Sequence, residues 1–226
     1  MRVPFTVEQF LDVFRQYNEG VWPAQWGLLA LGLMAVVLAF RGSARLQRTV
    51  SGILGALWFW MGLVYHLGYF RAINPAALIF AILFVTQAAL FIWLGVIQRR
   101  LAFRAHPDVH GVLGALFVAY ALVGYPILGV ALGHRYPAAP TFGLPCPTTI
   151  LTFGLLLWAT MPVPRALLVI PVLWTAIATS AALQLGMRED LGLLVAGVVG
   201  TVGVLIRDRS ARSRGTIMTR THREST

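Results

Sequence analysis

Long apolar segments alternate with short arginine-bearing segments along the whole chain. Most of the apolar segments are about 17 to 25 residues long, the length that an α-helix needs to cross the hydrocarbon core of a bilayer. They lie at about residues 24–40, 50–70, 76–97, 111–132, 147–161, 166–186 and 190–206. The pattern therefore predicts an all-α protein, a polytopic transmembrane helix bundle of about seven spans.

The fifth of these spans is the shortest, because prolines bracket it. Pro145 and Pro147 fix its start, since proline suits the first turn of a helix. Pro162 and Pro164 fix its end, since proline interrupts a helix interior. Such a short helix either crosses the membrane or re-enters on the same side, and the choice changes the number of crossings. Pro126 lies inside the fourth span and predicts a kink there.

The first 20 residues follow a different pattern, with apolar side chains at three- and four-residue steps on one helix face. These side chains are Val3, Val7, Phe10, Phe14 and Tyr17. Thr6 and Gln9 fit a capping box, and Gly20 suits a helix end. We expect an amphipathic helix in the membrane interface, with a soluble helix packed on loops as the alternative. The predicted organisation is this outer-face helix at 1–21, a seven-helix transmembrane domain at 22–206 and an Arg-rich disordered tail at 207–226.

Composition supports a membrane protein, and the charge distribution orients it. Hydrophobic residues make up 58% of the chain, charged residues 12%, and the mean hydropathy is +0.75. All 18 basic residues are arginines, and thirteen of them follow the first, third and fifth spans or lie in the tail. Because arginine marks the cytoplasmic side, we expect a bacterial inner-membrane protein with its N-terminus outside and its C-terminus inside. Arginines placed in this way are topology determinants and indicate no nucleic-acid partner.

The segment 133–149 is the most unusual polar stretch, and it lies on the predicted outer face. Its Cys146 is the only cysteine and begins the fifth span, where unpaired helix N–H groups favour the thiolate. This position indicates a soft-metal ligand or a reactive thiol, and a small packed residue at a helix start is the alternative.

The triplet His134-Arg135-Tyr136 opens the same segment. Arg135 and the N-terminus of the fifth span are suited to holding an anion through charge-assisted hydrogen bonds. The alternative is an arginine that reaches to the headgroups without a ligand. Glu19 is a candidate partner for Arg135 or Arg71 across the outer face.

His66 lies about one turn inside the outer end of the second span, close to Asn74 in the following connection. Polar groups at that depth are costly unless they are paired, so they are functional or hydrogen-bonded. With His134 and Cys146 on the same side, two imidazoles and one thiolate would form a metal site. Two histidines also suit axial haem ligation, and a buried histidine bonded to a neighbour is the remaining alternative. Glu189 and Asp190 open the seventh span, where a helix N-terminus favours acidic residues.

Three blocks of sequence resemble a known family. They are PFTVEQFLDVFRQYN…VWPAQ at 4–25, YHLGYFRAINPAA at 65–77 and GHRYPAAPTFGLPCPTTILTFG at 133–154. Together they resemble a family of bacterial integral membrane proteins of about 220 residues, catalogued as a domain of unknown function. The resemblance implies a membrane architecture and transfers no catalytic residue.

Motifs for hydrolases, kinases, nucleotide binding and redox dithiols are missing from the sequence, which disfavours an enzyme. We expect a binding or transport protein with an outward-facing site for a small ligand, an anion or a metal. The expected site residues are His66, Asn74, His134, Arg135, Tyr136, Glu19 and Cys146. The alternatives are an accessory subunit that docks partner membrane proteins and a haem- or metal-binding redox protein.

Overall fold

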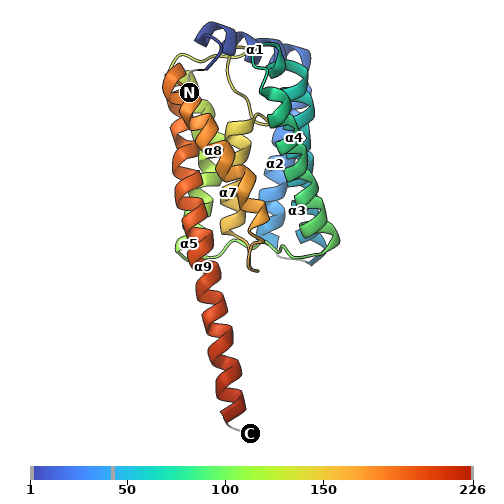
Figure 1. The fold of residues 1–226 in the computed structure, drawn as a ribbon, viewed down its shortest axis with the longest axis vertical. Coiled ribbons are helices and arrows are strands. Elements are labelled where there is room, and N and C mark those ends of the chain that lie inside the picture. Colours follow the sequence, from blue (N-terminus) through green and yellow to red (C-terminus); the bar gives the residue numbers. More distant parts are fainter. Residues whose placement is uncertain (1–2, 42–43, 225–226) are drawn as a thin grey trace.

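The chain forms an elongated bundle of helices with two distinct ends (Figure 1). The structure is a computed structural model that describes residues 3–41 and 44–224, with side chains for 3–41 and 46–210. Helix α1 (Val7–Gly20) lies across one end, and helix α9 (Leu191–Glu224) extends beyond the other. We refer to these as the α1 end and the tail end.

Six helical segments of the described chain are long and apolar enough to cross a membrane. They are Ala24–Arg41, Leu46–Ala72, Ala77–Ile97, Val109–Ala131, Ala166–Leu185 and Arg188–Ser210. Their elements are α2 (Ala24–Arg41), α3 (Ala44–Trp60), η1 (Met61–Tyr69), η2 (Phe70–Ala72), α4 (Ala77–Leu90), η3 (Phe91–Ile97), α5 (Val109–Ala119), η4 (Tyr120–Gly124), α6 (Tyr125–Ala131), α8 (Ala166–Leu185), η5 (Arg188–Asp190) and α9. These segments agree with six of the seven predicted spans, which confirms a polytopic all-α membrane bundle.

The remaining predicted span, 147–161, is helix α7 (Pro145–Leu157), which is too short to cross a bilayer as a helix. Its 13 residues rise about 20 Å, whereas a hydrocarbon core is about 30 Å thick. The segment 133–144 descends from the α1 end to meet it, so the chain still passes from one end to the other (Figure 1). Irregular backbone at membrane depth is stable when protein surrounds it, and α7 packs against α2, α3, α5 and α9.

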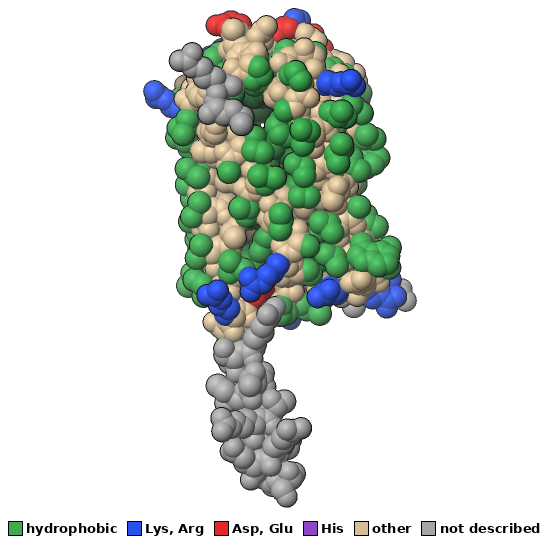
Figure 2. Space-filling model, viewed as in Figure 1, with side chains coloured by type: hydrophobic (Ala, Val, Ile, Leu, Met, Phe, Trp, Pro, Cys, Tyr) green, Lys and Arg blue, Asp and Glu red, His purple; other side chains and the backbone are tan. Residues whose placement is uncertain are grey.

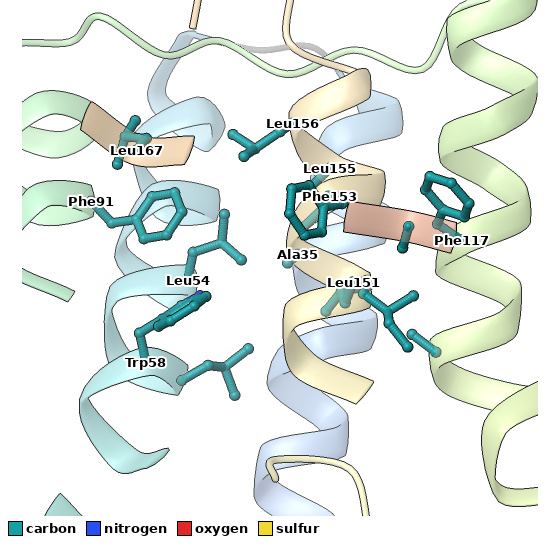
Figure 3. Close-up of a cluster of buried hydrophobic side chains, with 14 of the residues drawn as sticks. Ala35, Leu54, Trp58, Phe91, Phe117, Leu151, Phe153, Leu155, Leu156 and Leu167 are labelled. Carbon is teal, nitrogen blue, oxygen red and sulfur yellow. The ribbon is translucent and has the colours of Figure 1, made fainter. Parts of the chain in front are cut away.

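Helix α7 forms the centre of the hydrophobic core in the tail half of the bundle (Figure 3). Leu151, Phe153 and Leu155 lie between Leu54 of α3 and Phe117 of α5. The indole Nε1 of Trp58 donates to Thr152 Oγ1 at 3.0 Å and so satisfies a polar group inside this core. At the tail end, Arg207 of α9 donates to the carbonyls of Leu156 and Leu157, which have no partner within α7.

The kink predicted at Pro126 takes the form of a π-helical segment, η4, between α5 and α6. Proline has no N–H and its ring clashes with the carbonyl four residues earlier, so the regular α-helical pattern breaks before it. Another π-helical segment, η1, carries Tyr65 and His66. Such segments often occur at functional sites, because they redirect side chains from a helix.

Helix α1 matches its prediction closely. The capping box between Thr6 and Gln9 is present, and the helix ends at Gly20. Its apolar stripe packs down onto the bundle, where Trp60 Nε1 donates to the buried Tyr17 hydroxyl at 2.8 Å. Helix α1 is therefore part of the fold and covers the ends of the other helices.

At the tail end, α9 continues to Glu224, through the segment for which composition predicts disorder. Arginines lie along this end, at the ends of the helices (Figure 2). The arginine-bearing segments that follow α2, η3 and α7 therefore lie together at the tail end, as the sequence predicts.

Candidate functional site

A cavity of about 560 Å³ lies beneath α1, and we call it the α1-end cavity. Its walls come from the segment 3–14, from η1 and η2, from the segment 140–147 and from α8. Aromatic side chains make up much of the lining, among them Phe5, Phe14, Tyr65, Phe80, Tyr125 and Trp174. The cavity is therefore an apolar, aromatic chamber at one end of the bundle.

The three blocks that carry the family resemblance meet at this cavity. Phe5 and Phe14 represent the first block, Tyr65 the second, and Leu144 and Cys146 the third. The predicted topology places all three blocks at one end, and the structure does the same.

The cavity opens on the side of the bundle, between α8 and the segment that precedes α4. Ala176, Ser180 and Gln184 of α8 line it while they are also exposed. The surface is hollowed on this face near the α1 end (Figure 2). Above the opening, the backbone N–H of Val3 donates to Gln184 Oε1 at 3.2 Å.

Polar groups gather at the inner end of the cavity, around Asp190. This carboxylate is 5% exposed, and the Tyr125 hydroxyl donates to its Oδ1 at 2.5 Å. The Cys146 thiol lies beside both Asp190 and Trp174. Trp174 is 8% exposed. The cavity thus ends in a carboxylate, a thiol and an indole.

Glu189 lies next to Asp190 and is fully buried. Its Oε1 is 2.6 Å from Nδ1 of His134, while its Oε2 has no partner among the described residues. The Tyr120 hydroxyl donates to the backbone carbonyl of Glu189 at 2.7 Å. Of the two buried carboxylates, only Glu189 contacts this imidazole, and within the described residues no arginine pairs with either carboxylate.

His66 is buried behind the cavity wall and is surrounded by aromatic rings. The rings of Phe84 and Trp174 are 4.6 and 5.1 Å from the imidazole centroid, and both approach edge to face. Neither ring nitrogen has a hydrogen-bond partner among the described residues. His66 does not line the cavity, and it contacts the cavity only through its neighbours.

The structure disperses the other predicted site residues. Asn74 lines the cavity, but its Oδ1 accepts from the Ala76 N–H at 3.0 Å and so stabilises the turn before α4. Arg135 and Tyr136 are exposed and contribute nothing to the cavity wall. Glu19 pairs with Arg15 at 3.5 Å, and not with Arg135 or Arg71, its candidate partners across the outer face.

The expected metal site is also not formed. Among the residues with described side chains, no group of three or more His, Cys, Asp or Glu residues could hold a metal ion. The physical reason is that each expected ligand has different neighbours. His134 binds Glu189, Cys146 lies beside Asp190, and His66 is enclosed by rings.

Asp190, Glu189 and Trp174 are the residues that the sequence analysis missed as site candidates. The acidic pair was interpreted only as a favourable charge at a helix N-terminus. A usable signal was present, because ionisable residues at the start of a membrane span are functional candidates by default. Trp174 offered no such signal, since tryptophan is common in membrane helices.

The chain matches one known protein family over most of its length. A family model described as a family of unknown function (DUF6064) matches residues 7–214. The chain belongs to this family. The match confirms the resemblance to an uncharacterised family of about 220 residues, and it extends over the described spans. Neither the curated proteins nor the solved structures contain a match to the chain.

Proposed function

We propose that this protein is a multi-pass membrane protein that binds a small amphiphile in the α1-end cavity. The observation that carries the proposal is the character of this chamber: its walls are mostly apolar and aromatic, it opens toward the side of the bundle, and it holds one buried carboxylate, Asp190. Its volume of about 560 Å³ is typical of small-molecule sites. An alkyl or ring portion fits the walls, and a polar head reaches Asp190.

The other ligand classes that the sequence suggested fit this site less well. An anion would meet the carboxylate of Asp190 without a compensating arginine, and like charges in a low-dielectric site repel strongly. A metal ion lacks a set of three ligands among the described side chains. A small amphiphile is the one of the three classes whose chemistry matches both the walls and the inner end.

The geometry supports binding more directly than transport. Beyond α7 Pro147, the space between the helices is filled by the close-packed core around Leu151 and Phe153 (Figure 3). A transport route would need that core to separate. We place the protein in the bacterial inner membrane with the α1 end outside, because arginines concentrate at the tail end (Figure 2).

The test is to purify the protein in a mild maltoside detergent and identify what it retains by native mass spectrometry. Ala178 lines the cavity and is 6% exposed, so Ala178→Phe would put an aromatic ring into the chamber and narrow it. Ala115 is exposed on α5, so Ala115→Phe adds the same volume elsewhere and serves as the matched control. We expect one amphiphile per chain in the wild type and in Ala115→Phe, and its loss in Ala178→Phe.

Two results would overturn the proposal. One is retention of the same molecule by Ala178→Phe, which would place it outside the cavity. The other is a ligand-free chain that arrives with stoichiometric partner proteins, which would favour the role of an accessory subunit.

A further inference from the structure

We infer that the ligand of the α1-end cavity is an amphiphilic amine. The inference rests on the proposed function and specifies the head group. In this arrangement the ammonium group lies against the Asp190 carboxylate.

The charge of the inner end points to a cation. Asp190 and Glu189 are both buried, and the one imidazole near them, His134, bonds Glu189. Tyr125 supplies a neutral hydroxyl to Asp190 and leaves its negative charge uncompensated. A buried charge without a partner costs several kcal/mol, so a ligand cation has a large advantage over a neutral head at this position.

The walls favour the same class of ligand. Aromatic faces attract ammonium groups through their quadrupole, and aromatic residues with one carboxylate are a common means of recognising organic cations. Tyr65 and Trp174 line the cavity near its inner end together with Tyr125. The alkyl part of the ligand then extends past Phe5 and Phe14 toward the side opening.

The experiment measures dissociation constants of three probes with the same ten-carbon chain: decylamine, decanol and decanoate. Binding is followed by quenching of tryptophan fluorescence in a maltoside detergent at pH 7, where the amine is protonated. We expect decylamine to bind at least tenfold more tightly than decanol, because a hydrogen bond between two charged groups is stronger than one between neutral groups. Decanoate should bind most weakly.

A near-isosteric variant tests the contact with Asp190. Asp190→Asn should abolish the preference of decylamine over decanol. A wild-type protein that binds decanol or decanoate as tightly as decylamine would overturn the inference, and this ranking needs no variant to fold. Failure of all three probes to bind, or equal binding to Ala178→Phe, would instead overturn the proposed function.

Discussion

The buried pair of His134 and Glu189 allows a quantitative test of the charge cluster. Glu189 is fully buried and His134 is its only side-chain partner among the described residues, at 2.6 Å. His134→Ala would leave a carboxylate with no partner for either oxygen. Breaking a fully buried charged pair by removing one partner costs roughly 3–5 kcal/mol. Because the His134 side chain is 16% exposed, water reaches this pair from one side, and we expect about 2–3 kcal/mol.

The assay is reversible unfolding by SDS in mixed micelles, followed by tryptophan fluorescence. Arg15→Ala provides the matched control, because Arg15 pairs with Asp12 and Glu19 on the exposed face of α1. An exposed pair contributes about 0–1 kcal/mol, so this variant should remain close to the wild type. Glu189→Gln removes the charge and keeps most of the shape of the side chain.

The double variant His134→Ala/Glu189→Gln should recover about 1–2 kcal/mol relative to His134→Ala, since an uncharged amide is cheaper to bury than a carboxylate. Destabilisation by His134→Ala that is no larger than that by Arg15→Ala would contradict the prediction. A double variant less stable than His134→Ala would also contradict it, because the buried charge of Glu189 would then not be the origin of the lost stability.

Three further predictions concern the α1 end. Asn18 donates to the carbonyls of Pro137 and Ala139 and accepts from Thr141, so Asn18→Ala should lower the thermal unfolding temperature more than Thr141→Val does, and equal effects would contradict this. Burial raises the pKa of Tyr17 to about 12. Its contribution to stability is therefore complete below pH 10 and is lost toward pH 12, a loss in unfolding titrations that Tyr17→Phe should remove. Cys146 lines the cavity, so bound decylamine should slow its alkylation by N-ethylmaleimide, and unchanged alkylation rates would place the ligand elsewhere.

Much of the fold could be predicted, because hydropathy alone decides which segments enter a bilayer. The spans at 24–40 and 166–186 agree with α2 and α8 within one residue at each end. The sequence rules for helix capping were equally reliable at α1, where the capping box marks the start of the helix and Gly20 marks its end. These features depend on residues within a few positions of one another, which is the range that a single sequence reveals.

The site was harder to predict, because its contacts join distant parts of the chain. Asp190 is 65 positions from its partner Tyr125, and Glu189 is 55 positions from His134. Sequence analysis correctly placed Cys146, His134 and Asp190 at one end of the bundle. It could not decide which of them face one another, since that depends on the rotation of each helix about its axis.

The length of α7 explains why a cavity exists at this end. A helix that crossed the whole bilayer from the tail end would need about 20 residues, and α7 has 13. The missing two turns lie before Pro145, where the chain forms the irregular segment 140–144 with a turn from Thr141 to Leu144. The α1-end cavity borders this segment and the first turn of α7. The prolines that shorten the fifth span therefore also set where the cavity lies, and α1 lies over it.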